Sequence, residues 1–163
     1  MDEMEYIERC LDLADKSSCS KKKYGSVIVK DDEIIGEGYN HPVTKEIEDL
    51  LCHPCIRENI NSGTRLEMCA AIHAEQAAII NAYKNGKDPE GATLYVAGKR
   101  NGETMVLNEK GFYCSFCSRI MAEVVIEKVG VLTKNGVEYL TKDEYLRSSF
   151  EFALGKKWLN ELE

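Results

Sequence analysis

The 163-residue sequence lacks a long apolar segment, an excess of basic residues and any internal repeat. No apolar run approaches the roughly 20 residues that a membrane-spanning helix needs, which argues against a membrane protein of that kind. With 21 Lys and Arg against 28 Asp and Glu, the formal net charge is −7. This balance argues against a broad surface for nucleic acids or membranes, although it leaves room for a small anion site.

Neither a secretory signal nor an interdomain linker is evident. Residues 1–5 are acidic and lead directly into a helical pattern, unlike a signal peptide. We therefore expect a cytoplasmic protein, whose thiols stay reduced and form no disulfides. Its length is that of a single domain, so we expect residues 1–163 to share one hydrophobic core.

Hydrophobic periodicity predicts alternating helices and strands. The predicted helices cover residues 3–17, 73–83 and 115–126 and a segment that begins at a Thr141/Glu144 capping box, and the predicted strands cover residues 24–29, 34–39, 93–97, 104–107 and 128–133. Residues 41–69 form an irregular, cysteine-rich excursion within this pattern. The main elements follow the order α-β-β-α-β-α-β-α, which predicts an α/β fold with a mixed sheet and helices on both of its faces.

Seven cysteines in a reducing compartment need an explanation, and the spacing supplies one for six of them. Cys114 and Cys117 are separated by two residues at the start of a predicted helix, and His73 opens another predicted helix. Two thiolates and one imidazole can hold a catalytic zinc ion that keeps its fourth position open. A helix N-terminus also favours the thiolate over the thiol. We therefore predict that His73, Cys114 and Cys117 bind Zn²⁺.

Glu75 follows the histidine by two residues, close enough to reach a water in the open position. Zinc lowers the pKa of such a water to about 7. Glu75 can then take its proton and deliver it to a leaving nitrogen, which are the two tasks of a general acid/base. A lone CxxC is as often a structural zinc site or a redox pair, and a lone His-x-Glu means little. The two motifs together predict hydrolytic chemistry with Glu75 as the catalytic residue.

At these residues the chain resembles the cytidine and deoxycytidylate deaminase superfamily, particularly its deoxycytidylate deaminase branch. The matching stretches are Cys19 and residues 24–29, 38–40, 69–79, 91–96 and 114–117, which together cover most of residues 5–133. Tyr113 stands where the family has proline, residues 99–112 form an insertion before the CxxC, and residues 114–119 are similar to a divergent microbial subgroup. The resemblance implies a three-layer α/β/α sandwich, a cytidine deaminase-like fold around a mixed five-stranded sheet.

The resemblance also implies a hydrolase that acts on a C–N bond of a cyclic amidine. The substrate would be a cytosine nucleotide, most simply dCMP converted to dUMP and ammonia, with Glu75 protonating N3 and then the departing ammonia. Asn40 would hold the sugar, the backbone amide of Ala74 would contact the pyrimidine edge, and Lys22 would contact the phosphate. As alternatives, Asn40 is a turn residue that ends a strand, and residues 21–23 are a solvated basic turn.

Four further cysteines have no catalytic partner: Cys19, Cys52, Cys55 and Cys69. Several deoxycytidylate deaminases hold a second, structural zinc ion in this part of the chain. An aperiodic segment of about 30 residues is long for a compact domain and needs a cross-link that holds it in place. The resemblance therefore implies a closed four-ligand zinc site, in which His41 or His53 can replace one cysteine. The alternative is that some of the four are buried thiols.

Three functions are compatible with these motifs. The first is a dCMP deaminase, the second a deaminase of another nucleoside, nucleotide or RNA base, and the third a non-catalytic zinc-binding module. The acidic chain argues against RNA, and Glu75 argues against the module, which has no use for that carboxylate. Family members commonly oligomerise, so we expect a homo-oligomer. The apolar residues near the C-terminus either face a subunit interface or complete the core; they are Phe150, Phe152, Leu154 and Trp158.

Overall fold

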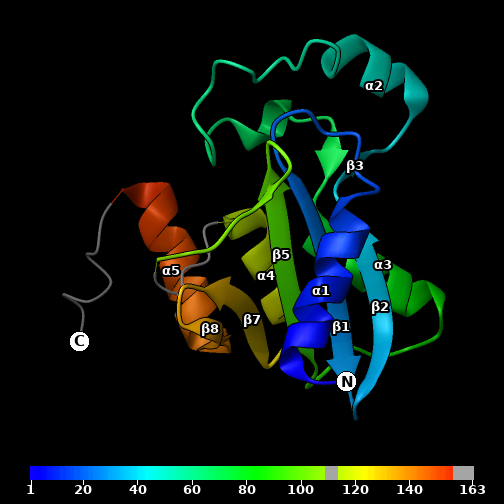
Figure 1. Cartoon of the computed structure of the whole chain (residues 1–163), viewed down its shortest axis with the longest axis vertical. Coiled ribbons are helices and arrows are strands. Elements are labelled where there is room, and N and C mark those ends of the chain that lie inside the picture. Colours follow the sequence, from blue (N-terminus) through cyan, green and yellow to red (C-terminus); the bar gives the residue numbers. More distant parts are fainter. Residues whose placement is uncertain (109–113, 156–163) are drawn as a thin grey trace.

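The computed structural model describes residues 1–108 and 114–155 and has a mixed β-sheet at its centre (Figure 1). The strands are β1 Lys23–Lys30, β2 Glu33–Tyr39, β5 Thr93–Arg100, β6 Glu103–Thr104, β7 Lys128–Thr133 and β8 Gly136–Thr141. Their order is β2-β1-β5-β7-β8, with β6 paired to β5. Strands β5 and β7 are parallel, and the other pairs are antiparallel.

The sheet has six strands, so the expectation of five is wrong in this detail. Strand β8 has no counterpart among the predicted strands. It forms a hairpin with β7, in which Thr133 pairs with Gly136 and Lys128 with Thr141. Four successive residues of β8 are half-buried, so its burial does not alternate as it does in a strand with one buried face.

Helices cover both faces of the sheet, which confirms the three-layer α/β/α arrangement (Figure 1). The helices are α1 Glu3–Ala14, α2 Lys45–Leu51, α3 Ala74–Lys84, α4 Ser115–Glu123 and α5 Lys142–Leu154. On one face, α1 buries Ile7 and Cys10 against β1 and β5. On the other face, residues of α3, α4 and α5 pack around Ile28 and Leu94 of the sheet. The predicted cap of the last helix is also present, since Thr141 Oγ1 accepts a hydrogen bond from Glu144 N.

The excursion over residues 41–69 is not irregular throughout, contrary to the sequence-based expectation. Helix α2 begins after Thr44, whose side chain accepts a hydrogen bond from Ile47 N. The excursion starts and ends at one place, because β3 (His41–Pro42) pairs with β4 (Ala71–Ile72), and it extends beyond one end of the sheet (Figure 1). Helix α2 escaped prediction because it buries no residue and therefore has no apolar stripe.

Helix α3 approaches β2 closely because Gly38 has no side chain. A Cβ atom at this position would lie 2.4 Å from the backbone nitrogen of Ala78 and 2.7 Å from the carbonyl oxygen of Ala74. Backbone atoms cannot give way cheaply, so glycine is required for this contact. The contact holds the first turn of α3 against the sheet, next to His73.

The predicted insertion, residues 99–112, is only partly described. Its first residues lengthen β5, and β6 pairs back onto β5 through Lys99 and Arg100. Residues 109–112, the neighbouring Tyr113 and the C-terminal Trp158 lie outside the described residues. Within the described ranges, no helix is both long and apolar enough to cross a membrane.

Candidate active site

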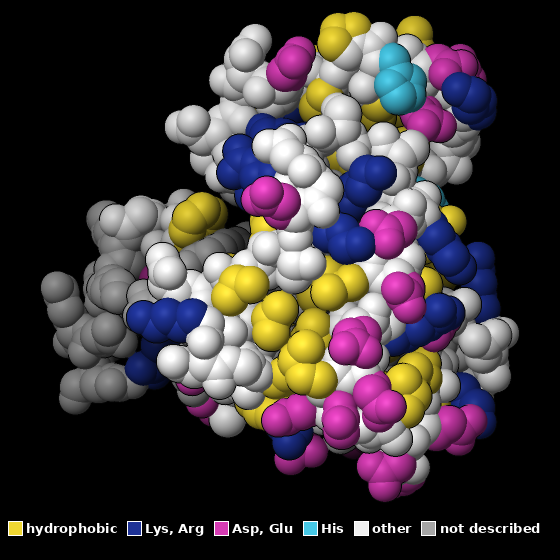
Figure 2. Space-filling view, in the orientation of Figure 1, with side chains coloured by type: hydrophobic (Ala, Val, Ile, Leu, Met, Phe, Trp, Pro, Cys, Tyr) yellow, Lys and Arg dark blue, Asp and Glu magenta, His cyan; other side chains and the backbone are white. Residues whose placement is uncertain are grey.

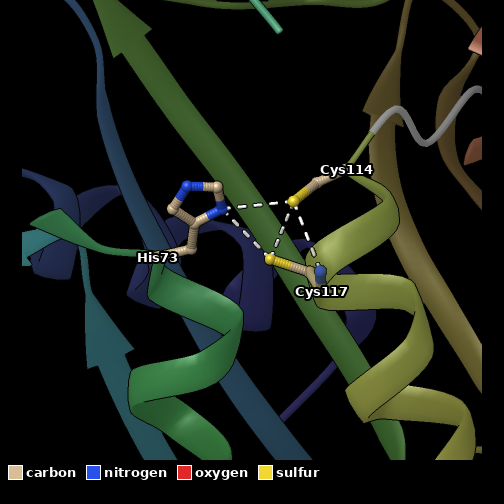
Figure 3. Close-up of side chains that lie close together, drawn as sticks. All are labelled: His73, Cys114 and Cys117. Atoms are coloured by element: carbon tan, nitrogen blue, oxygen red, sulfur yellow. Dashed lines mark hydrogen bonds between the residues drawn. The ribbon is translucent and has the colours of Figure 1, made fainter. Parts of the chain in front are cut away.

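The three predicted zinc ligands meet at one point (Figure 3). Nδ1 of His73 lies 3.1 Å from Sγ of Cys117 and 3.2 Å from Sγ of Cys114, and the two sulfur atoms are 3.1 Å apart. In residues 1–108 and 114–155, these are the one group of three or more His, Cys, Asp or Glu whose ligand atoms all lie within 4.8 Å of one another. One imidazole and two thiols at these distances fit a zinc ion with an open fourth position.

Two helix N-termini position these ligands. His73 immediately precedes α3, and its backbone N–H donates to the side chain of Gln76 at 3.1 Å. Cys114 is the N-cap of α4, and its sulfur accepts a hydrogen bond from Cys117 N at 3.3 Å. Both helices therefore point their positive dipole ends at the cluster, which favours the thiolate forms that bind metal.

The electrostatics of the cluster already favour a thiolate. The side-chain hydrogen bond with Cys117 and then the one with His73 outweigh burial and lower the pKa of Cys114 to about 4. The pKa of Cys117 is raised beside the charged Cys114 sulfur. A dication at the centre would reverse this second effect and hold both groups as thiolates.

Glu75 lies in the first turn of α3 and lines the same cavity as His73 and Cys114. Its side chain is only 6% exposed, and burial raises its pKa above the usual value of 4.5. A buried carboxyl group whose pKa has moved towards neutrality is suited to accept and return a proton. The structure therefore places a buried carboxyl group, which could carry a proton, in the same cavity as the candidate metal ligands His73 and Cys114.

The cluster opens into a cavity of about 300 Å³, a volume suited to a small molecule. All three predicted substrate-binding residues line this cavity: Lys22, Asn40 and Ala74. Its wall also includes residues that no motif indicated, among them Arg57, Leu107 and Phe152. Leu107 and Phe152 are ordinary apolar residues in the sequence, so only the fold could reveal that they face the site.

The side chain of Asn40 holds the start of β1 in place. Its Oδ1 accepts a hydrogen bond from Tyr24 N at 2.8 Å, and its Nδ2 donates to the carbonyl oxygen of Lys22 at 2.9 Å. Asn40 is 8% exposed. Both bonds join Asn40 to the chain around the start of β1, and its contact with a sugar stays a prediction.

The residues of the basic cluster 21–23 have different surroundings. Lys21 Nζ donates to the carbonyl oxygens of Arg57, at 3.0 Å, and Ile60, so it fastens the excursion. Lys22 lines the cavity, whereas Lys23 begins β1 and pairs with Lys99. The pKa of Lys22 is lowered by burial and then by the neighbouring charges of Arg100, Lys21 and Arg57.

The other four predicted ligands line a second, smaller cavity of about 30 Å³; they are Cys19, Cys52, Cys55 and Cys69. Their sulfur atoms do not form a group within 4.8 Å of one another. Neither candidate histidine lines this cavity. Each has another polar neighbour: Nδ1 of His41 lies 2.9 Å from the Pro42 carbonyl oxygen, and Nε2 of His53 lies 3.5 Å from Glu48 Oε1. All seven cysteines of the chain are free thiols.

Comparisons with known proteins agree with this site. The profile of the cytidine and deoxycytidylate deaminase zinc-binding region matches residues 1–133. A deoxycytidylate deaminase from Mycobacterium phage D29 is 31% identical over 123 residues, which cover 71% of this chain and 82% of the phage protein. The deoxycytidylate deaminase of Saccharomyces cerevisiae is 34% identical over 84 residues, which cover 50% of this chain but only 26% of the yeast protein.

A solved structure has the same fold. The dCMP deaminase from cyanophage S-TIM5, in complex with dCMP and dUMP, superimposes with a TM-score of 0.55 at 20% identity. The match covers 80% of this chain and 82% of the cyanophage protein. The chain therefore belongs to the zinc-dependent cytidine and deoxycytidylate deaminase family, whose members are hydrolases of C–N bonds.

Proposed function

We propose that this protein deaminates dCMP to dUMP and ammonia. The observation that carries the proposal is a single cavity with a His-Cys-Cys cluster and a buried Glu75 at one place and the basic residues Lys22 and Arg57 in its wall. Cationic groups in the same wall as the zinc ligands favour a substrate that carries a phosphate. The relatives from phage D29 and yeast are deoxycytidylate deaminases, which supports the same substrate class.

In the proposed mechanism, His73, Cys114 and Cys117 would hold a zinc ion, which would supply a water of lowered pKa. Glu75 takes one proton from this water and delivers it to N3 of the cytosine ring while the water oxygen bonds to C4. Glu75 then takes the remaining proton from the hydroxyl on C4 and gives it to the amino nitrogen, so that the C4–N bond breaks, ammonia leaves and uracil forms. The backbone amide of Ala74, at the first turn of α3, contacts the pyrimidine edge, and Asn40 contacts the sugar.

A substrate panel tests this proposal. Release of ammonia and the loss of ultraviolet absorbance are measured with cytosine, adenine and guanine nucleosides and nucleotides and with a cytosine-containing RNA oligonucleotide. We expect dCMP to give the highest kcat/KM. A preference for a nucleoside, for another base or for RNA would identify a different deaminase, and no turnover of any compound would support a non-catalytic module.

Glu75→Ala tests the role of the carboxylate separately. We expect this variant to lose at least about 10³-fold in kcat, because the proton carrier is absent, while it retains the zinc held by His73, Cys114 and Cys117. Turnover at the wild-type rate, or loss of that zinc, would contradict the role assigned to Glu75. His73→Ala is the matched variant that should lose both zinc and activity.

We also propose that Cys19, Cys52, Cys55 and Cys69 hold a second, structural zinc ion. Four thiols from three separate segments line one small cavity, and four cysteines are a common ligand set of a closed, structural zinc site. Such a site would fasten the excursion to the rest of the domain. Cysteines bind zinc only while they are reduced, so we propose that the protein works in the cytoplasm, where thiols stay reduced.

Metal analysis of the purified protein tests the second site. We expect about two zinc ions per chain, and about one for Cys52→Ser, because a hydroxyl is a poor zinc ligand. Cys10→Ala is the matched control, because Cys10 lies on the buried face of α1, within the core. This variant should keep two zinc ions per chain. A wild-type value near one would refute the second site.

A further inference from the structure

Arg57 is a buried basic residue whose hydrogen-bonding capacity is largely unused. Its side chain is 7% exposed, and Nη2 donates to the carbonyl oxygen of Thr64 at 2.8 Å. Its Nε is buried and has no hydrogen-bond partner among the described residues. A buried guanidinium N–H without an acceptor is unfavourable, and such groups are nearly always paired in folded proteins. The missing acceptor is therefore expected to come from a bound molecule.

The position of Arg57 indicates which molecule this is. Arg57 lines the cavity that contains His73 and Glu75, and Lys22 lines it too. Glu75 is the one acidic residue in the described cavity wall, and neither Arg57 nor Lys22 forms an ion pair within the described part of the chain. Figure 2 shows Lys and Arg side chains where the excursion meets the body of the molecule, while acidic side chains predominate at the opposite end. This part of the cavity attracts an anion.

We propose that Arg57 recognises the 5′-phosphate of the substrate and thereby makes the enzyme select a nucleotide over a nucleoside. The planar guanidinium, with several N–H donors unused, matches the oxygen atoms of a phosphate, and Lys22 adds a second positive charge. The lowered pKa of Lys22, caused by burial and by the neighbouring cations, agrees with a group of like charges that an anion would stabilise. This inference rests on the proposed function and names the residue that determines its substrate class.

The excursion holds Arg57 ready for this contact. The carbonyl oxygen of Arg57 accepts hydrogen bonds from Lys21 Nζ and from Ile60 N, both at 3.0 Å. Arg57 follows Cys55 by two residues and lines the smaller cavity of the four cysteines as well as the main cavity. The two bonds to its carbonyl oxygen hold the backbone of Arg57, and the Nη2 bond to the Thr64 carbonyl oxygen holds its guanidinium. A side chain that is already held in this way loses less freedom when it binds a ligand, which increases affinity.

The test compares dCMP with deoxycytidine as substrates. For Arg57→Ala, the ratio of kcat/KM for dCMP to that for deoxycytidine should fall by about 50-fold, mainly through KM, because a charge-assisted hydrogen bond to the phosphate is lost. Arg57→Lys keeps the positive charge but lacks the planar guanidinium with its several N–H donors. Its ratio should therefore fall, but less than that of Arg57→Ala. The control is Arg65→Ala, which removes an exposed arginine of the same excursion and should leave the ratio unchanged.

Direct binding separates this inference from the proposed function. Calorimetric titration of dUMP and deoxyuridine into the wild type and Arg57→Lys needs no turnover, and thermal melting shows that each variant is folded. Tighter binding of dUMP that weakens in Arg57→Lys would support the inference even if the protein does not deaminate dCMP. Efficient deamination of dCMP with the same substrate ratio in both Arg57 variants would overturn the inference and leave the proposed function intact.

Discussion

At the scale of single residues, Asn40 holds the start of β1 in place and also lines the main cavity. Both of its polar atoms bind the backbone of β1 or of the residue before it, and its side chain faces the cavity. The Gly-Tyr-Asn motif identifies the residue in the sequence. The two hydrogen bonds that make Asn40 structural could not be predicted, because their partners lie sixteen and eighteen residues away.

We expect Asn40→Ala to lower the free energy of unfolding by about 1–3 kcal/mol, because it leaves the buried N–H of Tyr24 without a partner. Urea denaturation at neutral pH measures this change. The exposed Asn61 provides a control, and Asn61→Ala should change the stability by less than about 0.5 kcal/mol. An Asn40→Ala protein with wild-type stability and reduced activity would mean that Asn40 serves only to bind the substrate.

At the scale of elements, an ion pair joins α1 to β2 across the edge of the sheet. Arg9 donates from Nε and Nη2 to the two carboxylate oxygens of Glu37, each at 2.8 Å. This hydrogen bonding is the main reason why the pKa of Glu37 is lowered from 4.5. Because the folded-state pKa is the lower one, the contribution to stability is present above about pH 4.5 and is lost as the pH falls through the folded-state value.

We therefore expect Glu37→Gln to destabilise the protein by up to about 1 kcal/mol at pH 7, since both side chains are partly exposed. At pH 3 the difference from the wild type should be smaller. Urea denaturation at the two pH values checks this. Loss of zinc in acid affects the wild type and the variant alike, so it does not change the difference between them. The exposed Arg65–Glu67 pair provides the comparison, because Glu67→Gln should have little effect at either pH. An equal loss at both pH values would show that the charge of Glu37 is irrelevant.

At the scale of the whole molecule, apolar side chains on the sheet-covering helices remain exposed. They include Ile80 and Tyr83 on α3, Phe116 and Ile120 on α4, and Phe152 and Leu154 on α5. Of the C-terminal residues that the sequence singled out, Phe150 is half-buried, whereas Phe152 and Leu154 are exposed. The exposed apolar residues favour a homo-oligomer, which buries such groups away from water.

We expect light scattering after size-exclusion chromatography to give a mass that is a multiple of the 18.4 kDa chain. Ile80→Lys introduces a charge on α3 and should shift the protein towards the monomer, because an unpaired charge at an interface is strongly unfavourable. Val43→Lys, at an exposed position in the excursion, should leave the mass unchanged. A wild-type mass equal to one chain would refute the oligomer.

The chemistry of the site could be predicted because its signals are local. His73 and Glu75 are two residues apart at the start of one helix, and Cys114 and Cys117 are three apart at the start of another. Ligand type, spacing and helix start therefore indicate a zinc site and a proton carrier without any knowledge of the fold. The strands and helices that have a clear apolar face could be predicted for the same reason.

Features that depend on contacts between distant segments could be seen only in the tertiary structure. It brings His73 to the cysteines across 41 residues of sequence, and it brings Arg57 from the excursion to the same cavity. Helix α2 and strand β8 have little apolar patterning of their own and depend on their neighbours. In the sequence, Arg57 is one basic residue among 21, and only its burial and its unpaired Nε distinguish it. Burial and pairing are properties of the packed chain, so the sequence by itself indicated a zinc-dependent deaminase, while the fold determined which residues line the cavity.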